Sequence, residues 1–253
     1  MTTQQDRTAL VTGASRGIGR GIARRLARDG ALVAVHCGAD EAAAKETVAL
    51  VESEGGRAFA LRADLAAPDA ADEVFTAYAR GLADHTDRTG LDVLVNNAAH
   101  TGAVAPEELT PEQLRRFLTV NAAAPLFLIQ RALPLMPPGG RVVNVSSGLT
   151  RRAFPDQVAY SMSKGALEQL TFALAPHLAA RGITINTVSP GRTDNGGPMF
   201  ANPEAVERMS RLSPFGRLGQ PEDIADVVAF VVSEQCRWIT GSLFDASGGQ
   251  LLR

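Results

Sequence analysis

Ser147, Tyr160 and Lys164 are side chains whose types and spacing suit acid–base chemistry. Tyr160 and Lys164 are four residues apart in a stretch that is predicted to be helical, so their side chains share one face. A phenol with a pKa of about 10 is a poor base at neutral pH, but a nearby ammonium favours the phenolate and lowers that pKa. Ser147 follows a predicted strand and can hold a carbonyl oxygen beside the phenol. We therefore predict proton exchange with a carbonyl or an alcohol.

A glycine-rich turn near the N-terminus is suited to bind a pyrophosphate. Gly13, Gly17 and Gly19 stand between a predicted strand (8–12) and a predicted helix (17–28). The start of a helix presents unpaired N–H groups and the positive end of the helix dipole to an anion. The spacing G-x-x-x-G-x-G differs from the common G-x-G-x-x-G fingerprint. Because the turn lies between a strand and a helix, we predict that it binds a dinucleotide.

The end of the next predicted strand distinguishes NAD from NADP. An acidic residue there accepts a hydrogen bond from the ribose 2′-OH of NAD, and this chain has Cys37 and Gly38 instead. Arg16 in the glycine turn can attract a 2′-phosphate. Asp40 follows closely and is interpreted as a helix N-cap. We expect NADP(H), with NAD(H) as the alternative cofactor.

Further polar residues stand where the second, third and fourth predicted strands end. His36 is interpreted as a strand-end residue that is partly buried, with contact to a phosphate as the alternative. Asp64 can accept a hydrogen bond from the adenine amine or act as an N-cap. Asn97 can tie neighbouring strands together, and the alanines after it leave room for a cofactor.

Apolar strands and amphipathic helical segments alternate along the whole sequence, which predicts βαβ units and a parallel sheet. We expect an α/β fold, a Rossmann-type doubly wound sheet, in a single domain over residues 1–253. A Gly/Pro-rich segment from residue 190 to about 215 is too irregular for the core, and loops of that length are often lids. Further strands are expected at 31–37, 57–63, 91–96, 141–146, 184–188 and 243–245, and further helices at 40–54, from about 68, 110–136 with interruptions, 158–181 and 221–232.

The composition narrows the functional classes. The formal net charge is −2 and the pI about 6.1, so nothing favours binding to nucleic acid or to an anionic membrane. We see no apolar run near the ~20 residues of a spanning helix and no secretion signal. Cys37 and Cys236 have neither a CxxC pattern nor histidines at metal spacing, so we expect two free thiols, no metal site and a cytoplasmic location.

In these motifs the chain resembles the short-chain dehydrogenase/reductase family, 3-oxoacyl reductases in particular, over essentially its whole length. The matching segments are 12–19, 96–99, 146–147, 160–164 and 190–191, together with Asn121. The resemblance implies four catalytic residues. Tyr160 donates the proton in reduction, Ser147 positions the substrate oxygen, Lys164 also binds the nicotinamide ribose, and Asn121 supports a water that links the lysine to solvent.

The resemblance also implies a cofactor site and an assembly. The implied cofactor-binding residues are Gly13, Ser15, Arg16, Gly17, Ile18, Gly19, Asp64, Leu65, Asn96, Asn97, Ala98, Tyr160, Lys164, Pro190, Gly191 and Thr193. Helices of the family pair across subunits, so a homotetramer, or a homodimer, is expected.

Two departures from the family pattern bear on the substrate. Ala99 stands where the family usually has glycine, and the basic residues that precede the fifth strand in carrier-protein reductases are missing, although Arg181 remains. We predict an NADPH-dependent reductase of a small-molecule ketone, such as a 3-oxoacyl thioester or a polyketide-like biosynthetic intermediate. The alternatives are an NAD-dependent secondary-alcohol dehydrogenase and a nucleotide-binding regulator without catalysis.

Overall fold

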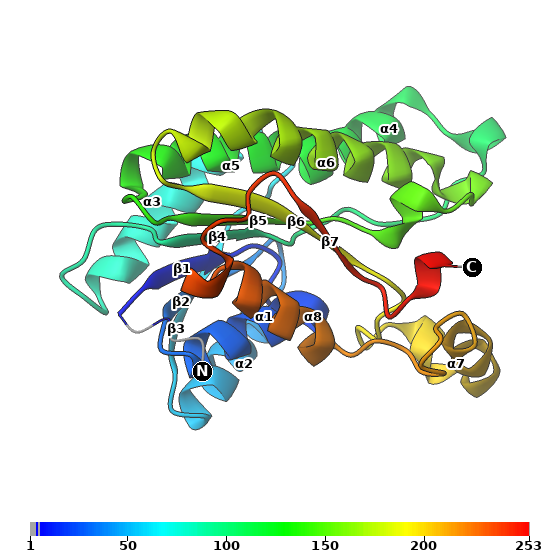
Figure 1. Ribbon diagram of the computed structural model, residues 1–253, viewed down its shortest axis with the longest axis horizontal. Coiled ribbons are helices and arrows are strands. Elements are labelled where there is room, and N and C mark those ends of the chain that lie inside the picture. The colour runs from blue at the N-terminus through cyan, green and yellow to red at the C-terminus, as the bar shows by residue number, and fades with distance from the viewer. Residues whose placement is uncertain (1–3, 5, 253) are drawn as a thin grey trace.

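The alternation of strands and helices builds one parallel sheet in the computed structural model, which describes residue 4 and residues 6–252. Within these residues the sheet has seven strands in the order β3-β2-β1-β4-β5-β6-β7 (Figure 1). The order reverses between β1 and β4, so the carboxyl ends of these two strands border the crevice where doubly wound folds bind ligands. The strands are β1 (Thr8–Val11), β2 (Leu32–Cys37), β3 (Arg57–Arg62), β4 (Val93–Asn96), β5 (Arg141–Val145), β6 (Thr184–Pro190) and β7 (Leu243–Ala246).

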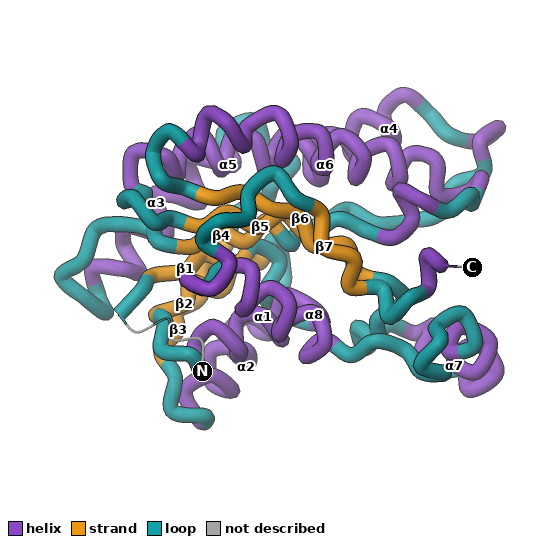
Figure 2. The backbone as a smooth tube through the Cα atoms, viewed as in Figure 1, coloured by secondary structure: helices purple, strands orange, loops and turns teal. Residues whose placement is uncertain are grey.

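Helices cover both faces of the sheet (Figures 1 and 2). One layer holds α1 (Gly17–Arg28), α2 (Glu41–Ser53) and α8 (Pro221–Val231). The other layer holds α3 (Ala70–Ala83), α4 (Pro111–Leu118), α5 (Ala124–Ala132) and α6 (Val158–Ala179). The short helix α7 (Pro203–Ser210) stands apart from the sheet.

The central strands are buried on both faces, which explains their unbroken apolar sequences. Val11 and Val95 pack in the core cluster under α1 and α8, whereas Leu10 and Leu94 pack in the cluster under α3 and α5. Each of these four side chains is fully buried, and each such burial stabilises the fold by about 2 kcal/mol. The expected fold class is therefore confirmed, and every expected strand and helix is present. Their ends lie within two residues of the expected ones, except that α5 ends at Ala132 and a 3₁₀ turn, Leu133–Leu135, continues the stretch expected to reach residue 136.

The helical stretch after residue 110 is interrupted, as expected. Thr110 and Gln113 form a capping box at the start of α4, and a π-helical turn, Thr119–Ala123, separates α4 from α5. By length and composition alone, Pro111–Leu135 is long and apolar enough to cross a membrane. The expectation that no run reaches this length was therefore wrong. In the structure this stretch packs against α3 and α6.

The segment expected to be irregular from residue 190 contains more structure than its sequence suggested. β6 continues through Pro190, and α7 begins at Pro203, where Asn202 caps the helix by accepting hydrogen bonds from the N–H groups of Glu204 and Ala205. Proline at the first helical position is compatible with a helix start. The sequence did not predict this helix because the segment is rich in glycine and proline.

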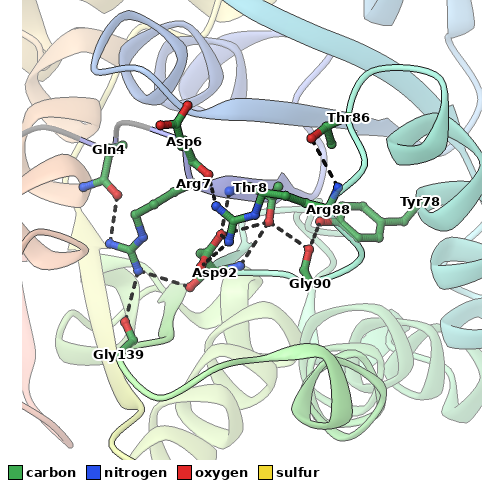
Figure 3. Close-up of polar contacts among 10 residues, drawn as sticks. All are labelled: Gln4, Asp6, Arg7, Thr8, Tyr78, Thr86, Arg88, Gly90, Asp92 and Gly139. Atoms are coloured by element: carbon green, nitrogen blue, oxygen red, sulfur yellow. Dashed lines mark hydrogen bonds and ion pairs between the residues drawn. The ribbon is translucent and has the colours of Figure 1, made fainter.

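A partly buried network of hydrogen bonds and an ion pair joins the amino ends of β1 and β4 (Figure 3), at the end of the sheet opposite the glycine turn. Asp92 is 7 % exposed, accepts from the backbone N–H of Thr8 at 2.8 Å and pairs with Arg88 at 2.9 Å. Tyr78 donates to the carbonyl of Gly90 at 2.8 Å. Arg7 adds bonds to the carbonyls of Gly139 and Asp92 at 3.1 and 3.4 Å. An ion pair and several hydrogen bonds therefore stabilise this end of the sheet. The candidate catalytic and cofactor-binding residues lie at the opposite end.

Candidate active site

The glycine turn has the backbone geometry that an anion cradle requires. Gly13 and Gly17 have φ angles of +63° and +54°, in the left-handed region that favours glycine. At Gly19 a Cβ would lie 2.3 Å from the carbonyl oxygen of Gly13 and 2.5 Å from Nδ2 of Asn97. No side chain fits there, because one of the two obstacles is backbone. The residues present therefore fit a dinucleotide phosphate approached by bare backbone.

Asn97 and Thr12 fasten the turn to the neighbouring strand. Asn97 Nδ2 donates to the carbonyls of Thr12 and Gly13 at 2.9 and 3.0 Å. The Thr12 hydroxyl accepts from the N–H groups of Asn97 and Ala98, both at 3.0 Å. Both protons of the Asn97 amide are thus used within the protein. Its side chain shapes the cofactor site, which agrees with the strand-tying interpretation.

His36 supports the same turn from β2. Its Nδ1 accepts from the N–H of Gly13 at 3.1 Å, and its Nε2 lies 3.0 Å from the carbonyl of Ala63. These contacts place the single proton of the neutral ring on Nε2. Burial lowers the pKa of His36 from 6.5 to about 4, so the ring is neutral at physiological pH. The structural interpretation of this residue is confirmed, and direct contact with a phosphate is not needed.

β2 itself ends without an acidic residue, but Glu41 of α2 lies close to this end, where it pairs with Arg62 at 3.2 Å. Arg16 is exposed beside the turn, and Asp40 caps α2 by accepting from the N–H of Ala43 at 3.0 Å, as expected. Arg62, which the sequence analysis did not single out, faces Cys37 across the β2–β3 pair, and its Nε reaches the Gly38 carbonyl at 3.4 Å. The pairing of two strands brings it there, so no local motif reveals it.

The remaining predicted cofactor residues border the same edge in different ways. Asp64 is exposed after β3 and accepts from the N–H of Ala66 at 2.9 Å, which leaves its other oxygen available. The Ser15 carbonyl accepts from Arg20 at 2.7 Å. The side chain of Leu65 is buried in the core cluster under α3 and α5, and that of Ile18 is half-buried against the cluster under α1 and α8.

The segment after β6 lies across the glycine turn. A Cβ on Gly17 would come within 3.0 Å of Cβ of Asn195, and one on Gly191 within 2.7 Å of the carbonyl of Ser247. Thr193 is 7 % exposed and forms an isolated parallel β-bridge with Gly219. Its hydroxyl donates a hydrogen bond to the Gly191 carbonyl at 3.2 Å. Residues far apart in sequence therefore border one edge of the sheet.

Lys164 lies in the interior, beside the end of β5. Its ammonium is 1 % exposed and donates to the carbonyl of Val145 at 2.8 Å. Nζ is 5.9 Å from the centre of the Tyr160 ring. Burial lowers the pKa of Lys164 from 10.5 to about 8, and the carboxylate of Glu168 opposes this change. The charge of Lys164 is thus sensitive to its neighbours.

Tyr160 corrects one part of the sequence argument. We expected the ammonium to lower the pKa of the phenol, but burial raises that pKa, and the hydrogen bond with Ser147 only partly opposes the increase. The physical reason is that a phenolate loses solvation inside the protein. Tyr160 therefore stays protonated at neutral pH in the protein alone. This state suits a proton donor in reduction.

Ser147 and Asn121 complete the group. Ser147 caps the short 3₁₀ turn Gly148–Arg151 by accepting from the N–H of Leu149 at 3.2 Å. Asn121 is fully buried in the π-helical turn, and its Nδ2 donates to the carbonyl of His100 and to the hydroxyl of Ser163, both at 2.9 Å. Its Oδ1 accepts from the N–H of His100 at 2.7 Å. Asn121 thus joins the helix carrying Lys164 to the chain after β4.

Comparisons with known proteins agree with this geometry. The family model described as enoyl-(acyl carrier protein) reductase matches residues 13–250. An uncharacterised oxidoreductase of Methylorubrum extorquens is 40 % identical, with 98 % of this chain and 99 % of that protein covered. The solved structure of the promiscuous reductase LugOII, which catalyses keto-reduction at C1 during lugdunomycin biosynthesis, is 58 % identical with a TM-score of 0.96, covering 98 % of each chain. The angucycline C-6 ketoreductase LanV with bound NADP is 54 % identical with a TM-score of 0.95, covering 100 % of each chain.

Proposed function

Because the chain belongs to the short-chain dehydrogenase/reductase family, we propose that it is an NADP(H)-dependent ketoreductase acting on a polyketide-like biosynthetic intermediate. The observation that carries the proposal is the grouping of Ser147, Tyr160 and Lys164 at the carboxyl end of β5. The Ser147 hydroxyl holds the substrate oxygen, and the buried phenol of Tyr160 keeps its proton until that oxygen becomes basic. Lys164 stabilises the phenolate that remains, and Asn121 fixes the helix that carries the lysine.

The cofactor is NADP(H), and the chemistry it supplies when bound is the transfer of a hydride. Arg16 can meet the 2′-phosphate at the end of β2, and Arg62, which pairs with Glu41 at 3.2 Å, lies at the same strand end. Gly13, Gly17 and Gly19 admit the pyrophosphate. The protein's part is to bind and orient the dinucleotide, and the segment from residue 190 to about 215 acts as a lid that excludes water during the reaction.

The proposed substrate class rests on the similarity to angucycline ketoreductases and on one feature of this chain. LanV has also been solved with NADP and rabelomycin, at 53 % identity and a TM-score of 0.93. This chain lacks the basic residues before β5 that would attract an acidic carrier protein. A free ketone, and not a carrier-bound thioester, is therefore the proposed substrate.

The proposed assembly is a homotetramer in the cytoplasm. Phe127 on α5 is 51 % exposed, and Phe172 and Met162 on α6 are 69 % and 51 % exposed. Apolar side chains gathered on neighbouring helices are better covered by a second copy of the chain than by water. Light scattering coupled to size-exclusion chromatography measures the mass, and a monomer would contradict this assembly.

The function is tested by following NADPH absorbance with a panel of polycyclic and simple ketones. We expect reduction with NADPH to exceed that with NADH, and Tyr160→Phe to lose at least a hundredfold in kcat while still binding NADPH. A strong preference for NADH with secondary alcohols would favour the NAD-dependent dehydrogenase. Unchanged turnover in Tyr160→Phe would refute the catalytic assignment, and NADPH binding without turnover of any ketone would favour the regulator.

A further inference from the structure

Glu168 lies one helical turn beyond Lys164 on α6, and the function proposed above gives it no role. Its side chain is only 15 % exposed. The carboxylate oxygen Oε1 accepts from the hydroxyl of Ser146 at 2.7 Å and lies 2.9 Å from the hydroxyl of Thr150. Oε2 is 3.6 Å from the guanidinium of Arg151. A carboxylate held by this many partners has a defined position.

The partners of Glu168 flank the serine of the reaction. Ser146 directly precedes Ser147, and the Thr150 hydroxyl also lies 3.0 Å from the Ser147 carbonyl. One carboxylate therefore contacts the residues on both sides of Ser147. The 3₁₀ turn that places the Ser147 hydroxyl is anchored to α6 through this carboxylate.

Glu168 also acts on the charge of Lys164, because the two residues are four positions apart on α6 and share one face of that helix. The ammonium is buried and donates a hydrogen bond to the neutral carbonyl of Val145. A buried charge is costly unless an opposite charge compensates it. Glu168 supplies that opposite charge. Two other titratable or charged groups face this pair among the described side chains: Tyr160 on α6 lies near Lys164, and Arg151 after β5 lies near Glu168. The ring of His100 packs against Phe117, which in turn packs against Tyr160.

We propose that Glu168 is a positioning residue of the active site, which serves as the counter-ion of Lys164 and at the same time anchors the turn that carries Ser147. This inference rests on the proposed function. Reduction of a ketone needs a hydride at the carbonyl carbon, which NADPH would supply when bound, and the C=O π pair then stays on the substrate oxygen. When Tyr160 gives its proton to that oxygen, the O–H bond of the phenol breaks, an alcohol O–H bond forms and a phenolate remains. That anion is stabilised only while Lys164 keeps its charge, and solvent returns the proton afterwards.

The chain has two lysines, which allows a direct test of the effect of Glu168 on Lys164. Lys45 and Lys164 are the only lysines, and Lys45 is exposed on α2, so the Cε resonance of ¹³C-labelled lysine can be followed for Lys164 alone in a Lys45→Arg background. Glu168→Gln removes the charge and keeps the shape. We expect it to raise the proton dissociation constant of Lys164 about tenfold.

Two control variants separate charge from anchoring. Ser146→Ala removes one hydrogen bond to Glu168 and keeps the carboxylate, so the dissociation constant of Lys164 should change less than twofold. Glu52→Gln makes the same chemical change at an exposed position of α2 and should leave that constant unaltered. A change below twofold in Glu168→Gln, or an equal change in Glu52→Gln, overturns the inference.

The pH profile of ketone reduction provides the second measurement. In Glu168→Gln the alkaline limb of kcat should move about one pH unit lower than in the parent. A purely structural role would reduce kcat equally at every pH and would refute the inference. Absence of NADPH-dependent ketone reduction in the unmodified protein would instead refute the proposed function, and the resonance titration would still measure the effect of Glu168 on Lys164.

Discussion

His36 makes the stability of the fold depend on pH. The ring is 1 % exposed and neutral in the folded protein, where burial lowers its pKa from 6.5 to about 4. In the unfolded chain the same ring gains its proton near the ordinary value. Its contribution to stability is therefore complete above about pH 6.5 and is lost as the pH falls towards 4.

The size of the effect follows from the two pKa values. Each pKa unit corresponds to about 1.4 kcal/mol, so the full loss is about 3 kcal/mol, of which about 2 kcal/mol is lost by pH 5. His36→Asn keeps an acceptor for the N–H of Gly13 but has no group that gains a proton. It should lower the free energy of unfolding at pH 7.5 and remove this part of its pH dependence.

Urea unfolding at fixed protein concentration, at pH 7.5, 6.5, 5.5 and 5, measures the difference between the parent and His36→Asn. That difference should shrink by about 2 kcal/mol over this range, since other titrating groups are common to both proteins. His177→Asn, at an exposed position of α6, is the matched control and should show a constant difference. A constant difference for His36→Asn as well would refute the assignment of a neutral, doubly hydrogen-bonded ring.

Three further predictions concern the cofactor site and the opposite end of the sheet. Gly19→Ala should raise the Kd for NADPH at least tenfold, because its Cβ would lie 2.3 Å from the carbonyl oxygen of Gly13. Gly165→Ala, which has open space around the added Cβ, should bind NADPH as tightly as the parent. Fluorescence titrations measure both. Arg16→Ala should weaken NADPH about tenfold and leave NADH unchanged, since one phosphate contact contributes ~1–2 kcal/mol; equal loss for both would contradict its role. Asp92→Ala should destabilise the fold by about 3 kcal/mol, and the exposed Asp87→Ala by less than ~0.5 kcal/mol, in urea unfolding.

Local spacing was enough to predict the parts of the site that lie within one element. Tyr160 and Lys164 share a helix face, and the glycines lie between a strand and a helix. For residues within one element, the spacing in the sequence determines how close they are in space. The capping box at Thr110 and the cap at Asp40 were predictable for the same reason. The alternation of strands and helices was likewise sufficient for the fold class.

The remaining features depend on contacts between distant segments. Arg62 reaches the end of β2 only through strand pairing, and Glu168 gains its partners because β5 ends beside α6. The pKa of Tyr160 depends on how deeply the phenol is buried, which spacing does not reveal. Helix α7 was missed because its sequence is rich in chain breakers, and its cap acts only once Asn202 is in place.

The π-helical turn Thr119–Ala123 corresponds to one residue more than a regular α-helix would hold over the same length. Removing that extra residue would let α4 and α5 continue as one regular helix. The side chains outside the turn would keep their faces, and those inside the turn would be repositioned. The Asn121 amide would then point away from the His100 backbone and from Ser163. A chain shortened in this way should fold with a more regular helix but lose the hydrogen bonds of Asn121 that hold the helix carrying Lys164. The irregular turn is therefore needed for activity.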